Sequence, residues 1–170
     1  VVDSKKKNGL FRNLNTIGKI DRFSGYLERQ PDVAKPLSFV NALKFARQAF
    51  YEGDSTYYGI LTQFEVPFMG NYIKGISKQS KDVASGSSAL NSMVSRFIDS
   101  NKQVARISVN MKDVGTTVLP VLLDSFRRNA DKIFDSAHYK VTFTGSTVTF
   151  LEGSTYIVDG LGESIFWAFI

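Results

Sequence analysis

The sequence predicts an α+β fold, in which a ferredoxin-like split βαβ sheet carries helices on one face and accepts inserted helices. The main evidence is that apolar and polar residues alternate over residues 103–111 and again over residues 139–144. Such alternation is typical of a strand with one buried face. Between these stretches, residues 117–134 repeat apolar side chains at the three- and four-residue spacing of an amphipathic helix. A strand, a helix and a second strand are therefore predicted in this order.

The start of this helix carries suitable residues. Thr116 or Thr117 can cap it, and Pro120 is then expected in the first turn, where its missing N–H has no intrahelical partner to lose. We expect the apolar face of the helix to pack on the sheet and to share a core with it. The residues predicted to form this core are Ile107, Val109, Leu122, Phe126 and Val141.

The first third of the chain predicts a short strand and a helix. Residues 1–3 have the composition of a strand end and are followed by a lysine-rich loop. Apolar residues at near-helical spacing predict a helix over residues 13–30, although each of the two glycines inside it weakens the helix by about 1 kcal/mol. Pro31 and Pro36 then mark a break before the next element.

Residues 38–94 are predicted to be a helical insertion. Ser38 can cap its first helix, and a second helix is expected over about residues 60–76, started or kinked by Pro67. The polar sequence SKQSKDVASGSS that follows has no periodicity and is typical of a linker. A turn or two of helix is expected after it. The apolar face of the first helix comprises Phe39, Leu43, Ala46 and Phe50.

The remaining elements complete the predicted fold. The sequence DSNK favours a turn, so residues 95–99 and 103–111 are predicted to form a hairpin. Right-handed crossovers would then place both crossover helices on the same face of the sheet. Ser146 can cap a final helix over residues 146–170. Residues 1–170 are thus predicted to be a single domain with a helical insertion and a C-terminal linking helix.

The end of the chain differs sharply in composition from the residues before it. Acidic, hydroxyl and glycine residues are frequent up to Glu163, whereas residues 165–170 are all apolar and include Trp167. Six apolar residues are too few to cross a bilayer, which needs about 20. We therefore expect this helix to continue into a membrane span in a longer protein, and the start at Val1 also looks like a cut. The alternative is that residues 165–170 fold back as a last core element.

Composition narrows the functional classes. With 43% apolar residues, the chain can bury a substantial core. It contains no cysteine and a single histidine, so neither a thiolate metal site nor a histidine zinc site is expected, and no cofactor is predicted. The net charge of +5 is spread along the chain without a basic stripe between exposed aromatic residues. A nucleic-acid partner is therefore not predicted.

No catalytic motif was found. The sequence lacks the glycine-rich, metalloprotease, nucleophile-elbow and EF-hand patterns. Asp32 or Asp54 could pair with Glu52 or Glu65 as catalytic carboxylates, but scattered acidic residues are more often solvated surface groups. His138 is interpreted as a surface or helix-capping imidazole rather than a base. We therefore predict that the protein is not an enzyme and has no catalytic residues.

Aromatic residues suggest one binding site. Phe64, Phe68, Met69 and Tyr72 follow helical spacing and could line a cleft for an apolar or amphiphilic ligand. The same spacing is also typical of a stripe that packs into a core. These four residues are the candidate substrate-binding residues.

Two long stretches resemble a known family. RISVNMKDVGTTVLPVLLDSF and YKVTFTGSTVTFLEGSTYIVDGLGES, the latter leading into IFWAFI, resemble the extracytoplasmic loop of exporters of the resistance-nodulation-division (RND) superfamily, in the MMPL-like branch seen in Bacteroidetes. The resemblance is good over residues 97–170. The opening VVDSKKKNGLF is similar to the segment that leaves the preceding membrane helix in this family, while residues 55–88 match loosely.

The resemblance implies a location and an architecture. It implies a periplasmic domain of a proton-driven exporter in a bacterial inner membrane, held by flanking transmembrane helices and forming part of the path for lipid-like or hydrophobic substrates. The proton-relay residues of the family lie in membrane helices outside this sequence, and no substrate residue is transferred. The substrate and the oligomeric state stay open. The alternative is a free-standing α+β module that binds a ligand or a protein.

Overall fold

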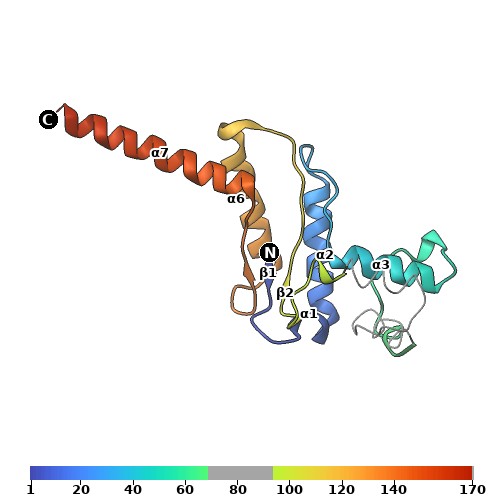
Figure 1. Cartoon of the computed structure of the whole chain (residues 1–170). Coiled ribbons are helices and arrows are strands. Elements are labelled where there is room, and N and C mark those ends of the chain that lie inside the picture. The colour runs from blue at the N-terminus through green and yellow to red at the C-terminus, as the bar shows by residue number, and fades with distance from the viewer. Residues whose placement is uncertain (69–93, 170) are drawn as a thin grey trace.

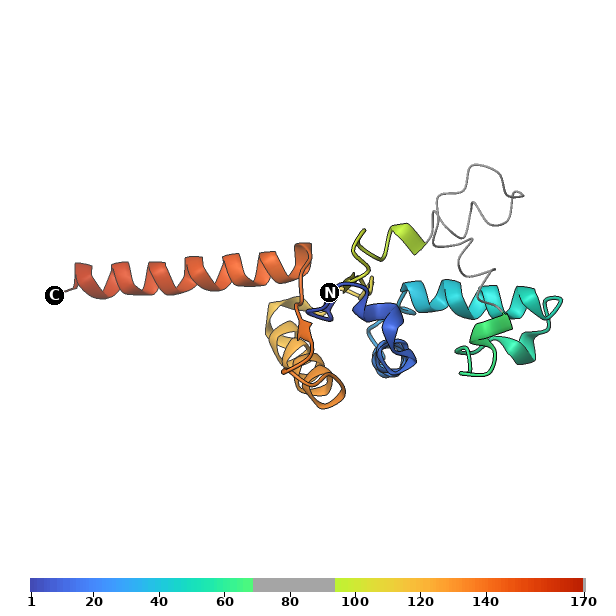
Figure 2. The same ribbon diagram turned by 90° about the horizontal axis from the view of Figure 1, so that it is seen from below.

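The chain has an α+β architecture in which two long helices lie on one face of a small antiparallel sheet (Figures 1 and 2). The computed structural model describes residues 1–68 and 94–169. The two helices are α2 (Leu14–Glu28), which follows the short α1 (Gly9–Arg12), and α6 (Gly115–Ile133). α2 and α6 contact each other, and the sheet runs across them.

The sheet has the order β2-β1-β3, with β1 (Val2–Asp3) in the centre between β2 (Val104–Ala105) and β3 (Lys140–Val141). Both pairings are antiparallel, so Val2 lies opposite Ala105 on one side and Val141 on the other. Ile98 adds an antiparallel bridge to Ala105 on the outer side of β2. Positions 98, 105, 2 and 141 therefore lie next to one another across the sheet, each antiparallel to its neighbour.

The strands are much shorter than the alternation predicted. The predictions of strands over residues 103–111 and 139–144 were wrong in length, because the structure has two-residue strands at these places. Beyond Ala105 the chain stays extended but changes partner, and bridges join Ser108 to Leu37 and Met111 to Val33. Alternation persists there because the segment still has one face toward the helices.

The predicted hairpin is present around a compact turn, but its first arm is not a strand. Val94 and Ser95 are helical, and Ile98 alone among residues 95–99 makes a bridge. The Asp99 carboxylate accepts hydrogen bonds from the backbone N–H groups of Asn101, Gln103 and Val104, at 3.1, 2.7 and 2.8 Å. These bonds hold the turn before β2.

α2 and α6 bury their stripes against each other and the sheet. Phe126 is 3% exposed, as predicted, and its ring meets that of Tyr26 edge to face. Of the other predicted core residues, Ile107, Val109, Leu122 and Val141 are partly buried and pack against this core. The fully enclosed side chains include Val2, Leu10, Ile20, Phe39 and Phe134.

α6 begins earlier than predicted. Its first residue is Gly115, at φ 72°, and the Asp113 carboxylate accepts the Gly115 N–H at 3.0 Å. The predicted cap at Thr116 or Thr117 was therefore wrong, since both residues lie in the first turn, and Pro120 lies inside the helix beyond that turn. A carboxylate two residues upstream takes the place of the expected hydroxyl cap.

The insertion begins with α3 (Phe39–Phe50), where Ser38 and Asn41 form a capping box as the sequence predicted for the Ser38 cap. The 3₁₀ helix η1 (Ser55–Tyr57) follows, and residues 66–68 are helical, with Pro67 in this stretch. The rest of the predicted helix over residues 60–76, the predicted linker and the helical turn after it lie outside the described residues.

α7 (Ser146–Ala168) projects from the body on the side opposite α3 (Figures 1 and 2). It starts at Ser146, as predicted, but Gly145 takes the N-cap position. Val148 is its one buried residue among those described. Within residues 1–68 and 94–169, no helix combines the length and apolar character needed to cross a membrane.

Candidate functional site

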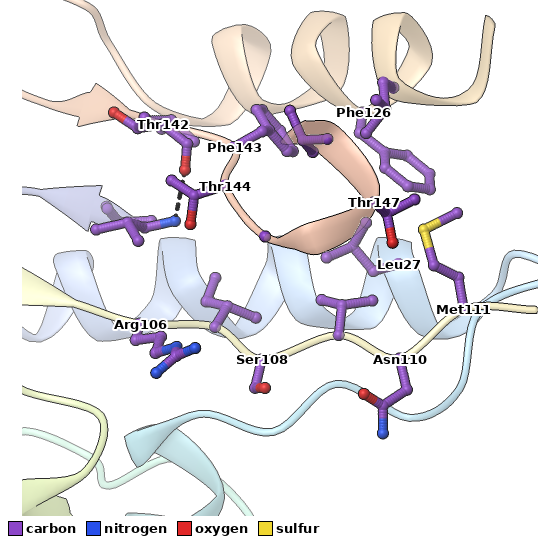
Figure 3. A pocket seen from close by; sticks show the side chains of 18 of the residues that line it. Leu27, Arg106, Ser108, Asn110, Met111, Phe126, Thr142, Phe143, Thr144 and Thr147 are labelled. Carbon is purple, nitrogen blue, oxygen red and sulfur yellow. Dashed lines mark hydrogen bonds between the residues drawn. The ribbon is translucent and has the colours of Figure 1, made fainter. Parts of the chain in front are cut away.

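A cavity of about 420 Å³ lies beside β1, between the extended segment that follows β2 and the segment that leads from β3 into α7 (Figure 3). The core side chains of α2 and α6 form its apolar floor, among them Phe23, Leu27, Leu123 and Phe126. Val1 and Val2 stand at one end, and Thr147 and Val148 of α7 line the other part. The cavity thus interrupts the sheet where β1 begins.

One wall of the cavity is an extended backbone whose hydrogen bonds alternate in direction. Ser108 exchanges bonds with Leu37 at 2.8 and 2.9 Å, and the Arg106 N–H donates to the Phe97 carbonyl at 2.7 Å, so both residues bond away from the cavity. In extended backbone the intervening residues face the opposite way. Ile107 and Val109 therefore turn their backbone groups toward the cavity, where no described residue bonds to them.

The opposite wall carries small polar groups. Thr142, Thr144, Ser146 and Thr147 contribute hydroxyls to this wall. Figure 3 shows Thr142, Thr144 and Thr147 across the cavity from Ser108 and Asn110, whose side chains point away from it. Among the described residues that line the cavity, Arg106 carries the one ionisable side chain. The lining therefore suits a neutral, partly apolar occupant with hydrogen-bonding groups along its length.

The amino group of Val1 is part of this site. It donates to the Thr142 carbonyl at 2.7 Å, and the Thr142 N–H returns a bond to the Val1 carbonyl at 2.8 Å. Burial, and then the nearby charge of Arg106, lower the pKa of the Val1 amine below its usual value. A positive charge is therefore disfavoured at the end of the cavity.

A second, more open hollow of about 600 Å³ adjoins the first. It lies between the starts of α6 and α7 and shares Met111, Ser146 and Thr147 with the first cavity. Leu119 and Phe150 supply its apolar surface. The two hollows therefore have a common wall at the base of α7.

The predicted substrate-binding aromatics lie elsewhere. Phe64 and Phe68 are on the insertion, 85% and 77% exposed, and neither lines the two hollows. Their exposure contradicts the alternative in which they pack into the core. Met69 and Tyr72 lie outside the described residues. A role for these four residues in binding stays a prediction.

Two of the four acidic residues considered for catalysis, Glu65 and Asp54, have structural partners for their carboxylates. Glu65 accepts hydrogen bonds from Arg47 at 2.8 and 3.0 Å, from the Tyr51 hydroxyl at 3.1 Å and from Thr62. Burial raises the pKa of Glu65, but the bonds from Thr62, Arg47 and Tyr51 outweigh this and lower the pKa to about 2. Asp54 accepts the Thr56 N–H at 2.9 Å at the start of η1. These carboxylates hold the insertion together.

His138 lies on the surface, with Nδ1 2.9 Å from the Asp135 carboxylate, just after α6. This position fits the prediction of a surface imidazole near a helix end. Among the described residues, no three histidine or acidic side chains gather as metal ligands would.

The sequence did not indicate the cavity. Ile107, Val109 and Val141 were predicted as core residues. The alternation around them indicates that one face of each strand is covered, but it does not indicate which element covers that face. The signal that could have indicated the cavity is the mismatch in length between the short strand predicted at residues 1–3 and the two long alternating stretches predicted to pair with it.

In comparisons with known proteins, no family model, curated protein or solved structure matches this chain.

Proposed function

We propose that this chain is the periplasmic portion of a proton-driven RND/MMPL-type exporter and forms part of the path taken by lipid-like or hydrophobic molecules. The observation that carries the proposal is α7, which leaves the body with most of its apolar side chains uncovered. Phe166, Trp167 and Phe169 are more than half exposed near its end. A surface of this kind is typical of a segment covered by a membrane or by another protein.

The distribution of charge on α7 supports a membrane-facing role. At 3.6 residues per turn, Glu152, Asp159 and Glu163 fall along one side of the helix. The opposite side carries exposed apolar residues. These are Phe150, Ile157, Leu161 and Ile165. The acidic side ends at Glu163, so the aromatic turn around Trp167 is suited to the boundary between headgroups and hydrocarbon.

The strand order supports a porter-like subdomain. Positions 98, 105, 2 and 141 are adjacent and antiparallel, and α2 and α6 lie on one face. This is the strand order expected of a ferredoxin-like split βαβ unit. We propose that residues 38–94 are the insertion of such a unit and that α7 links it to a membrane span.

The insertion offers the surface for hydrophobic molecules. It exposes large apolar side chains on α3, around η1 and in the segment after it. These side chains are Phe45, Phe50, Tyr57, Tyr58, Phe64, Val66 and Phe68. Exposed aromatic side chains that belong to one part of a fold can bind apolar surfaces without a charged partner.

Trp167 allows a direct test of membrane contact, because it is the single tryptophan of the sequence. The chain is mixed with vesicles of phosphatidylethanolamine and phosphatidylglycerol, and tryptophan emission and flotation are measured. We expect a blue shift and flotation with the vesicles. The double variant Phe166→Asp, Phe169→Asp should lose both, whereas Phe64→Asp on the insertion should keep both. Unchanged emission with no flotation would contradict the membrane proposal.

The same measurement separates the alternative function. A blue shift that grows with protein concentration in the absence of lipid would mean that α7 is covered by protein, as in a free-standing interaction module. A second arm titrates a fluorescent fatty-acid analogue into the chain. We expect Phe64→Ser with Phe68→Ser to weaken its binding at least threefold. Val121→Ser, at a 67% exposed position on α6 outside both hollows, should leave it unchanged. Equal effects of the two variants would count against a substrate surface on the insertion.

A further inference from the structure

We propose that the 420 Å³ cavity beside β1 is the seat of an additional stretch of β-strand, an extended peptide segment that continues β1 beyond the amine of Val1 and pairs with both walls. Such a segment would run antiparallel to residues 106–109 on one side and to residues 142–144 on the other. The inference concerns the sheet itself and does not rest on the proposed transport function.

The phase of the existing ladders points to a strand. On the β2 side, the Ser4 N–H bonds the Gln103 carbonyl at 3.0 Å and Val2 lies opposite Ala105. Bonded pairs recur every second residue in an antiparallel ladder, so the next two pairing positions are Ile107 and Val109. Their backbone groups face the cavity and have no partner among the described residues.

The pairing of β1 with β3 independently indicates that a strand would fit in the cavity. Val1 and Thr142 form a bonded pair, with distances of 2.7 and 2.8 Å. The next pairing position is therefore Thr144, whose backbone groups also lack a bond to any described residue. Both walls of the cavity therefore place backbone groups without a partner among the described residues where a single central strand that continues β1 could bond to them. A small apolar molecule would cover the floor but would supply no hydrogen-bond partner to these backbone groups.

Side-chain alternation specifies the occupant further. Val2 is fully buried over the helices and successive residues point to opposite faces, so the residue joined to Val1 would face the helices again. The third residue counted back from Val1 would do the same. Both would lie over the apolar floor formed by Phe23, Leu27 and Phe126. The occupant is therefore an extended segment with apolar residues at these two positions.

The amine of Val1 fits this assignment. Its 2.7 Å bond to Thr142 has the geometry of a ladder bond, which a peptide N–H would make equally well. Burial and Arg106 disfavour the positive charge that a free amine carries at this point. A peptide bond at Val1 would remove that charge and keep the hydrogen bond.

The test extends the chain at Val1 with the acetylated tetrapeptide Thr-Val-Thr-Val, which places valine at both inward positions. The control is Val-Thr-Val-Thr, which has the same length and composition but places threonine inward. Backbone amide hydrogen exchange is measured by NMR. We expect exchange of the Ile107, Val109 and Thr144 amides to slow at least tenfold in the first extension and less in the control. The Ser108 amide, already bonded to Leu37, should change little.

Three results would overturn the proposal. One is unchanged exchange of all three amides in the extended chain. Another is equal protection by the two extensions, because a seated strand must distinguish inward valine from inward threonine. The third is protection by the free acetylated tetrapeptide added to the original chain, with none from the extension, which would assign the cavity to a separate peptide.

Discussion

The helices α6 and α7 carry apolar residues at similar spacing, yet one is covered and the other is not. The stripe of α6 is buried against α2 and the sheet, whereas α7 projects from the body with Val148 as its one buried residue. The difference lies in the surroundings, because α6 is followed by β3, which returns the chain to the sheet beside β1. Helical periodicity therefore indicates which face is apolar but not what will cover it.

The largest effect is expected from truncating Phe126, the largest buried side chain of α6. Phe126→Ala should lower the free energy of unfolding by about 3 to 5 kcal/mol, because it removes a ring that contacts Tyr26 and forms part of the floor of the cavity beside β1. Urea denaturation followed by circular dichroism measures this loss. A loss below about 1 kcal/mol would mean that α6 does not depend on this packing for its stability.

A smaller effect is expected from a single hydroxyl at the base of α2. The Thr16 side chain is 1% exposed and its hydroxyl lies 2.9 Å from that of Tyr139. Tyr139→Phe keeps the ring but leaves Thr16 without this partner, and should cost about 1 to 2 kcal/mol in denaturation. Tyr26→Phe is the control, since its bond to Ser125 is exposed to water and should cost less. Equal losses would show that burial of Thr16 does not matter.

The covered region also shows what could be predicted from the sequence. The helices of the body were predictable because a one-sided stripe such as Ile17, Ile20, Phe23 and Leu27 needs a covered face whatever covers it. The strand lengths were not, because alternation looks the same whether residues 106–111 pair with a strand or with the extended residues 32–37. The start of α6 depends on the Asp113 carboxylate bonding Gly115, a local choice among several polar residues.

The candidate site was less predictable than the fold. The cavity beside β1 is lined by five separate segments of the chain, and none of its residues has an unusual type or spacing. The insertion is intermediate, because the Ser38 cap was predictable but the bonds from Arg47, Tyr51 and Thr62 to Glu65 were not. A hydrogen-bonded cluster needs the fold before its members can be recognised.

That cluster allows a pH test of the insertion, with a smaller effect than the core variants. The pKa of Glu65 is about 2, below its usual value near 4.5, so its stabilising bonds are fully present above about pH 4.5 and are lost as the pH falls toward 2. We expect the Thr62 amide, which bonds Glu65 at 2.8 Å, to exchange faster in Glu65→Gln than in the unchanged chain at pH 6. The ratio of the Thr62 exchange rate in Glu65→Gln to that in the unchanged chain should fall toward one as the pH is lowered to 3.

Glu52→Gln serves as the control on the same insertion, because it removes an exposed carboxylate that does not bond Thr62. It should leave the exchange of the Thr62 amide unchanged across this pH range. A ratio for Glu65→Gln that stayed constant from pH 6 to pH 3 would mean that the Glu65 carboxylate is not what protects Thr62.

The smallest change in the free energy of unfolding is expected for a substitution on α7. It tests directly whether α7 is uncovered while α6 is buried. Phe150 is 65% exposed, and replacing it by alanine removes few contacts while improving helix propensity slightly. Phe150→Ala should therefore change the free energy of unfolding by less than about 0.5 kcal/mol, in contrast to the same substitution at Phe126. The change is measured by the same urea denaturation without lipid, and flotation with vesicles of phosphatidylethanolamine and phosphatidylglycerol is measured in parallel. If lipid covers the apolar side of α7, Phe150→Ala should weaken flotation at least twofold and leave the unfolding curve without lipid unchanged. A destabilisation without lipid as large as that of Phe126→Ala would instead place Phe150 in the folded core and remove the contrast between the two helices.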